Sequence, residues 1–148
     1  MTTAAVDTNI SNLPAADQAR TDVATTGTTT TVSVTGPALS DLVVTTNTNA
    51  PNLVLDGSFR SSAFVGGAAI PERFTVTSGN RVKKSTFRLG GDSFKDVIKF
   101  DKKAKAKKVR IADFEDGDKL KYKGKTYTAD DVNGNRFAGL SKKEIKLV

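Results

Sequence analysis

A repeat of side-chain type at a fixed interval constrains the fold of this chain more than any other feature. Residues 86–100 align with residues 108–122 after a shift of 22 positions, so that Ile98 meets Leu120 and apolar residues meet apolar residues. The other matched pairs are Phe87 with Val109, Arg88 with Arg110, Leu89 with Ile111, Asp96 with Asp118, Lys99 with Lys121 and Phe100 with Tyr122. Such self-similarity is typical of stacked repeats, in which each coil buries its inner face on its neighbours.

Short runs of β-branched and aromatic residues recur about every eleven residues between residues 31 and 122, and turn-forming residues separate most of them. Two strands for each 22-residue coil predict an all-β chain that folds as a parallel β-solenoid, flattened like a β-roll. The alternative is an antiparallel sandwich or meander, because turns of about six residues also suit hairpins. The residues expected to point inward are Phe87, Leu89, Ile98, Phe100, Val109, Ile111, Leu120 and Tyr122. In the upstream coils Val65 is expected to lie in register with Phe87, and Val76 with Ile98.

The composition divides the chain into three segments. Residues 1–30 are rich in Thr and Ala and have few large apolar side chains, so we expect an extended arm that a neighbouring molecule orders, with a short helix around residues 15–23. Residues 31–122 form the predicted solenoid. Residues 123–148 contain an Asn-Gly turn signal and are expected to cap the open end of the solenoid, because an uncovered end exposes unpaired strand edges.

Several classes of function are disfavoured by residue types that the chain lacks. It contains no cysteine and no histidine, which removes disulfides, thiolate and imidazole metal sites, and His- or Cys-based catalysis. Paired acids at Glu115–Asp118 and Asp130–Asp131 are typical of exposed turns, so we expect neither enzymatic activity nor a cofactor. The apolar runs are too short to span a membrane, and the first residues do not form a secretory leader.

Charge is distributed unevenly along the sequence. Residues 1–59 contain five acids and one base (Arg20), a net charge of −4, whereas residues 60–148 contain 22 bases and 11 acids, a net charge of +11. The run from Lys102 to Lys108 is expected to protrude as a basic turn that either is a solvated loop or contacts an acidic protein surface, and the lack of interleaved aromatic residues disfavours nucleic acid as the partner. The candidate partner-binding residues are Lys102, Lys103, Lys105, Lys107 and Lys108, together with Ile10 and Leu13 of the arm.

Residues 89–100 (LGGDSFKDVIKF) resemble a degenerate repeat of the RTX, or hemolysin-type, calcium-binding β-roll, and residues 109–120 (VRIADFEDGDKL) resemble the segment that closes such rolls. The general style also resembles virion proteins of marine bacteriophages. The RTX calcium repeat is G-G-x-G-x-D-x-U-x, but Asp92 and Phe94 occupy glycine positions here. We therefore expect metal-free turns in which Asp96 and Asp118, the calcium candidates, accept hydrogen bonds from backbone.

These observations favour a non-enzymatic virion structural protein, such as a capsid decoration, cement or knob-type subunit of a bacteriophage. In this interpretation the chain is made in the host cytoplasm, is anchored by its arm to the major capsid protein or another virion protein, and forms homo-oligomers within the assembly. No membrane contact is expected. The alternative is an RTX-like, calcium-binding secreted or surface-layer protein located outside the cell, and a nucleic-acid-binding module is a third hypothesis.

Overall fold

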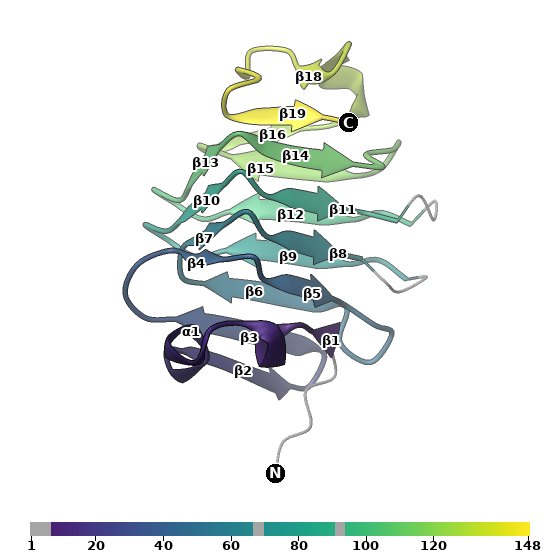
Figure 1. Cartoon of the computed structure of the whole chain (residues 1–148). Coiled ribbons are helices and arrows are strands. Elements are labelled where there is room, and N and C mark those ends of the chain that lie inside the picture. Colours follow the sequence, from purple (N-terminus) through teal and green to yellow (C-terminus); the bar gives the residue numbers. More distant parts are fainter. Residues whose placement is uncertain (1–6, 67–69, 91–93) are drawn as a thin grey trace.

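The chain folds as an all-β parallel solenoid. A computed structural model describes residues 7–66, 70–90 and 94–148, and in it about four turns of parallel coils are stacked about 23 residues apart (Figure 1). Strands of successive coils pair in parallel, which confirms the predicted solenoid and excludes the antiparallel sandwich. Among the described residues no helix is long and apolar enough to cross a bilayer.

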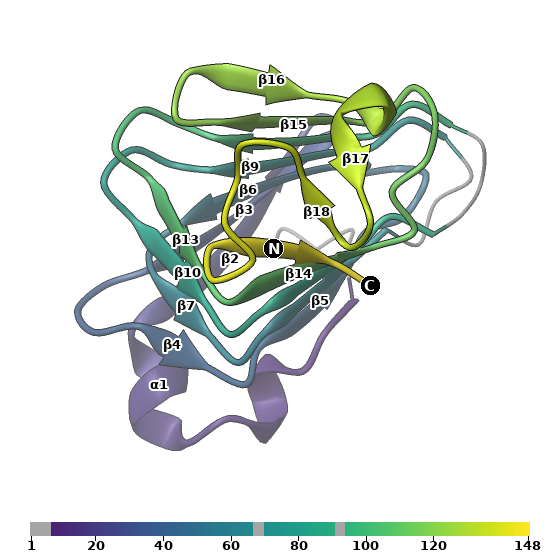
Figure 2. The same ribbon diagram turned by 90° about the horizontal axis from the view of Figure 1, so that it is seen from above.

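Each coil contributes to three sheets, and Figure 2 shows them as the sides of the coil seen along its axis. The seven-stranded sheet contains β2 (Thr21–Thr26), β3 (Thr29–Val34), β6 (Asn52–Asp56), β9 (Arg73–Val76), β12 (Val97–Phe100), β15 (Lys119–Tyr122) and β16 (Lys125–Tyr127). The six-stranded sheet contains β1 (Asp7–Thr8), β5 (Val43–Thr45), β8 (Ala63–Val65), β11 (Thr86–Arg88), β14 (Val109–Ala112) and β19 (Ile145–Leu147). The four-stranded sheet contains β4 (Leu39–Ser40), β7 (Phe59–Arg60), β10 (Arg81–Lys83) and β13 (Lys105–Lys107). The prediction of two strands per coil was therefore wrong, because it missed the four-stranded sheet.

The register agrees with the 22-residue shift in one sheet and departs from it in another. Ile98 of β12 pairs with Leu120 of β15, as predicted. Phe87 of β11 pairs with Ile111 of β14, so the predicted pairing of Ile111 with Leu89 was wrong by two residues. The upstream pairings were also wrong, since Phe64 rather than Val65 faces Phe87 and Phe74 rather than Val76 faces Ile98. The turns at the corners differ in length from coil to coil, and a constant shift cannot follow them.

A continuous hydrophobic core fills the solenoid. All eight residues predicted to point inward are buried. Aromatic rings form a column through successive coils, with centroids 5.1 Å apart for Phe64 and Phe87, 6.1 Å for Phe87 and Phe100, and 5.2 Å for Phe100 and Tyr122. These separations lie in the range in which aromatic pairs attract each other beyond the gain from burial.

The N-terminal segment, predicted as an extended arm over residues 1–30, is folded on the first coil from residue 7 onward (Figure 1). Strand β2 pairs antiparallel with β3 through a turn at Gly27, where φ is 61°, and β1 pairs antiparallel with β5. In the sequence, η1 (Ile10–Asn12) and the short helix α1 (Ala15–Ala19) lie between β1 and β2. The segment is ordered by its own chain because β3 would otherwise present an unpaired edge at the end of the solenoid.

The C-terminal segment lies over the opposite end of the solenoid (Figure 1). Strand β16 turns back antiparallel on β15, and β19 adds in parallel to β14. Between them are η2 (Ala129–Asp131) and a hairpin of β17 (Val132–Asn133) and β18 (Arg136–Phe137). The buried ring of Phe137 packs edge-to-face on Phe114 with centroids 4.9 Å apart, which attaches the hairpin to the last coil.

Candidate docking surface on the four-stranded sheet

The outer face of the four-stranded sheet gathers positive charge. Alternate residues of its strands point inward, and Phe59, Val82 and Ala106 are buried there. The residues on either side of these side chains consequently project outward. In β10 and β13 every outward residue is a lysine or an arginine. We define the cationic face as these residues and the adjoining corner lysines: Arg60, Arg81, Lys83, Lys84, Lys105, Lys107 and Lys108.

Parallel pairing aligns these cations in rows along the solenoid axis. Lys83 lies between Arg60 of the preceding coil and Lys107 of the next one. A second row pairs Arg81 with Lys105. Neighbouring strands of a sheet are about 4.8 Å apart, and alternate residues of one strand are about 6.7 Å apart. The backbone therefore arranges the Cα atoms of these cations in a regular lattice.

The corner beside this sheet has the same backbone conformation in every coil. Its residues lie in the left-handed region, with φ of 63° at Asp41, 50° at Ser61, 51° at Lys84 and 54° at Lys108. This conformation is unfavourable for residues other than glycine, so the surroundings must hold it in place. In the Lys84 coil that support comes from Ser85, whose hydroxyl donates to the Lys83 carbonyl oxygen at 2.9 Å and accepts the Ser62 N–H at 3.0 Å.

The positive charges on this face are not neutralised by neighbouring acids. Within the described part of the chain the ion pairs are Arg20–Asp17, Lys99–Asp101 and Lys123–Glu144, and none of them includes a residue of the cationic face. The charge of Lys107, and after it that of Arg60, lowers the pKa of Lys83 below its usual value. Cations of one row thus repel one another when no anion is bound.

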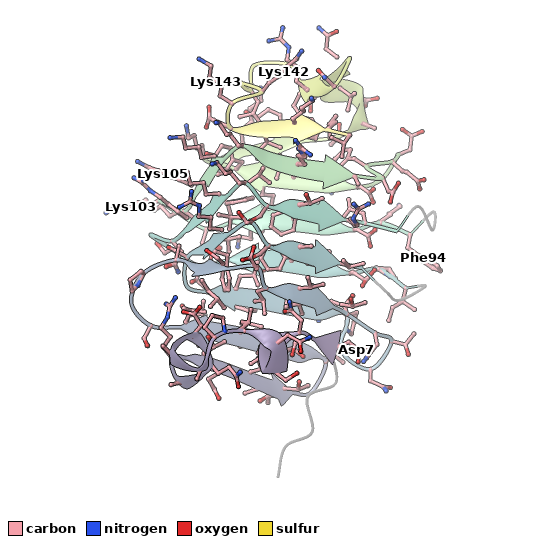
Figure 3. All side chains as sticks on the ribbon, viewed as in Figure 1. Asp7, Phe94, Lys103, Lys105, Lys142 and Lys143 are labelled. Atoms are coloured by element: carbon pink, nitrogen blue, oxygen red, sulfur yellow. The ribbon has the colours of Figure 1, made fainter. Side chains whose placement is uncertain are left out.

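Two hollows border the cationic face. The larger has a volume of about 710 Å³ and extends from residues 36–38 across the sheet to Lys143 and Glu144. The smaller, of about 460 Å³, lies beyond the corner and is lined by Lys84, Thr86, Lys108, Val109, Arg110, Lys142 and Lys146. Lys105 and Lys143 project from the same side of the molecule in Figure 3. Glu144, the carboxylate in the larger hollow, is already held by Lys123 at 2.8 Å and by the Tyr122 hydroxyl at 2.9 Å.

The basic run Lys102–Lys108 does not form the protruding turn that we predicted. Lys105–Lys107 is strand β13, because Lys and Ala alternate and the strand buries Ala106. The buried N–H of Ala106 donates to the Tyr122 hydroxyl at 3.1 Å.

The structure places the predicted binding lysines in two locations. Lys105, Lys107 and Lys108 belong to the cationic face, whereas Lys102 and Lys103 lie in the turn before β13, beside a different hollow. Sequence reasoning missed the face residues of the preceding coils: Arg60, Arg81, Lys83 and Lys84. The Arg-Val-Lys alternation over residues 81–83, one coil before Lys-Ala-Lys, was the signal that could have identified them.

Ile10 and Leu13, predicted to bind a partner, pack on the protein's own core instead. Leu13 is only 7% exposed, and Ile10 is partly buried against the same cluster. The helix and strands around them bring these side chains onto the first coil, where they cover apolar surface at the end of the core. They are therefore part of the N-terminal closure of the solenoid.

Asp96 and Asp118 accept hydrogen bonds from the backbone, as the sequence suggested. The Asp118 carboxylate accepts the N–H groups of Asp96 and Glu115, each at 2.8 Å. The Asp96 carboxylate accepts the N–H of Glu72 at 2.9 Å. Both aspartates are buried, and no group of three or more Asp, Glu, His or Cys residues that could hold a metal occurs among the described residues.

Comparison with known proteins adds no relative: no protein-family model, no curated protein and no solved structure matches this chain. The β-solenoid is compatible with a β-roll-like fold. The resemblance to the RTX family rests on the sequence of residues 89–100 and 109–120 alone.

Proposed function

We propose that this chain is a non-enzymatic structural protein that attaches as a rigid block to an acidic protein assembly through its cationic face. Specifically, we propose that it is a decoration or cement subunit of a bacteriophage capsid and that its partner is the major capsid protein or another virion protein. The observation that supports it best is the set of unpaired cations held in register on the four-stranded sheet. Complementary charge of this kind promotes encounter with an acidic partner and fixes the orientation of the complex.

The architecture suits a subunit that must keep its shape on the surface of a particle. The aromatic column runs from coil to coil, and antiparallel strands close the long sheet at both ends. The stacked coils can therefore present a docking surface of fixed shape.

The means of attachment differs from the one expected from the sequence. Residues 7–30 belong to the folded body, so the proposal assigns anchoring to the cationic face rather than to an arm. Several copies would bind equivalent acidic sites on one particle, which agrees with the expected repetition of the subunit within an assembly.

The experiment is to find the chain in virus particles from a producing culture. Particles are separated on a density gradient, and fractions are probed with an antibody against the chain and with one against the major capsid protein. We expect both proteins in the particle band at a constant ratio, with release of this chain at about 1 M salt, where electrostatic attraction is screened within about 3 Å. A chain that stays entirely in the particle-free fractions would contradict the proposal.

A further inference from the structure

The geometry of the cationic face restricts what can bind to it. Its two rows are about 6.7 Å apart along the strand direction, as between Arg81 and Lys83 or between Lys105 and Lys107, and successive cations of one row are about 4.8 Å apart across the strands. An extended peptide places the side chains of alternate residues on one side at the same interval of about 6.7 Å. In a peptide that runs along the strands, acidic side chains two residues apart would therefore face the two outward cations of one strand.

The composition of the face favours carboxylates over a nucleic acid. Five of its seven cations are lysines, which attract carboxylates and phosphates alike as point charges, so the aromatic residues decide between the two. The aromatic residue of this sheet, Phe59, is fully buried and cannot stack on a base. Single-stranded nucleic acids are held by such stacking as well as by charge.

The larger hollow provides room for a peptide over the outer face of the sheet. Residues 36–38 form one side of it, and Lys143 stands at the other side with a further positive charge. Glu144 also borders the hollow, but Lys123 and Tyr122 hold its carboxylate, so it does not pair with the lysines of β10 or β13. The charge of the hollow is thus strongly positive.

We propose that the outer face of the four-stranded sheet binds an acidic protein segment in an extended conformation, in which Asp or Glu alternates with uncharged residues. This inference rests on the proposed function, because it names the part of the partner that the subunit would grip. Binding neutralises the repulsion among these cations, and it removes the cause that lowers the pKa of Lys83 in the free protein.

The test measures binding of two labelled synthetic peptides to the full chain by fluorescence anisotropy. One peptide contains five Glu-Thr repeats, and the other has the same composition with its glutamates contiguous. We expect the alternating peptide to bind more tightly, and to weaken as salt rises from about 0.01 to 0.15 M. Equal affinity for the two peptides would show that the spacing of the glutamates does not matter, and would overturn the proposed match between alternating acids and the cations of the face.

Two double variants localise the site. Lys105→Gln/Lys107→Gln removes two charges from the cationic face, and Lys119→Gln/Lys121→Gln removes two charges with the same spacing from β15 on the seven-stranded sheet. We expect the first variant to weaken binding about fivefold or more and the second by less than about twofold. Equal losses in the two variants would overturn the assignment to this face.

Three further outcomes distinguish a failure of this inference from a failure of the proposed function. Tighter binding of a ten-nucleotide thymidine oligomer than of the alternating peptide would identify a nucleic-acid surface and refute the proposal. If the chain co-purifies with particles and the β13 variant attaches as the wild type does, the inference and the assignment of anchoring to the cationic face both fail, and the virion assignment alone stands. If the alternating peptide binds as expected while the chain is absent from particles, the inference stands and the virion assignment fails.

Discussion

At the scale of single residues, a buried acid precedes each of three successive strands of the seven-stranded sheet. Glu72, Asp96 and Asp118 stand directly before β9, β12 and β15, and each is at most 2% exposed. The carboxylate of one coil accepts the backbone N–H of the acid in the coil before it, from Asp118 to Asp96 and from Asp96 to Glu72. These bonds fix the register between coils at the turn where the strands begin.

Replacing Asp118 with alanine should destabilise the protein substantially. The variant leaves two backbone N–H groups, those of Asp96 and Glu115, without the acceptor that they use in the wild type. An unsatisfied buried donor costs about 1–3 kcal/mol, so we expect the free energy of unfolding to fall by about 2–4 kcal/mol. Urea denaturation followed by circular dichroism measures the difference.

Asp116→Ala is the matched control, because Asp116 lies on the same turn and is exposed. It should change the free energy of unfolding by no more than about 0.5 kcal/mol. Equal effects of the two substitutions would contradict the structural role of Asp118. A large stabilisation of the wild type, but not of Asp118→Ala, by millimolar calcium would show that the carboxylate binds metal instead.

Glu144 should make the stability of the protein sensitive to acid. The ammonium group of Lys123 lowers the pKa of Glu144 below its ordinary value of 4.5, with a further contribution from the Tyr122 hydroxyl and against the effect of burial. A carboxyl group whose pKa is lower in the folded state stabilises that state above pH 4.5 and loses this effect as the pH falls through the folded value. Glu144→Gln should therefore be less stable than the wild type at pH 7, by at most about 1 kcal/mol, with the difference shrinking at pH 3.5.

Urea titrations of both proteins at the two pH values measure this effect. Lys123→Gln serves as a second variant, because it removes the main cause of the lowered pKa while leaving the carboxylate in place. A difference between Glu144→Gln and the wild type that is as large at pH 3.5 as at pH 7 would contradict the linkage.

At the scale of elements, the sequence predicted the strands that alternate over several residues and missed the shortest ones. Residues 97–100 and 119–122 bury every second side chain, so their period of two was visible. Phe59–Arg60 and Arg81–Lys83 contain only two and three residues, with one inward side chain each. A single inward residue has no period, and therefore only the neighbouring coils show that these segments are strands.

The register was less predictable than the coil itself. The step between paired residues is 20 from Val43 to Ala63 but 24 from Thr86 to Arg110. Corner turns absorb the difference, since side chains at a corner need not alternate. The 22-residue match between β12 and β15 thus gave the correct architecture and the wrong partners for β11.

The folded N-terminal segment should resist trypsin in the isolated protein. Arg20 is the only Lys or Arg among residues 1–59, so cleavage after it reports on this segment alone. Its guanidinium group donates to the Thr35 carbonyl oxygen at 3.0 Å, and the Thr21 hydroxyl donates to the Asp17 carbonyl oxygen at 2.7 Å. Cleavage requires local opening of these contacts, and we expect a 20-residue fragment to appear only slowly in a time course followed by mass spectrometry.

Leu13→Ala provides the comparison, because Leu13 packs this segment on the core. Removing its buried side chain should speed cleavage at Arg20, since the opening becomes easier. Immediate cleavage of the wild type at Arg20 would show that the segment is a free arm, as the sequence alone suggested.

At the scale of the whole molecule, the solenoid converts the order of the sequence into position along an axis. The net charge of −4 in residues 1–59 therefore lies toward the N-terminal end and that of +11 in residues 60–148 toward the C-terminal end (Figure 1). The sequence showed this asymmetry and the basic run of residues 102–108. It did not show the cationic face, because the alignment of Arg60, Lys83 and Lys107 depends on the register of a sheet that was not predicted.

The stability of the protein should increase with salt concentration, because the cationic face carries unpaired charges. Repulsion among the cations lowers the pKa of Lys83, so the folded state holds this proton less firmly than the unfolded chain does. Its charge consequently destabilises the folded state at neutral pH, and this effect disappears as the pH rises through the folded pKa. Raising the ionic strength from about 0.01 to 0.15 M shortens the screening length from about 30 to 8 Å, and we expect the Tm of the wild type to increase. Lys83→Gln/Lys107→Gln should start with a higher Tm at low salt and gain less from added salt, whereas Lys119→Gln/Lys121→Gln should respond as the wild type does. Identical salt responses in all three proteins, measured by thermal melts at pH 7, would show that the rows do not repel enough to matter, and would remove the physical reason for an anion to bind there.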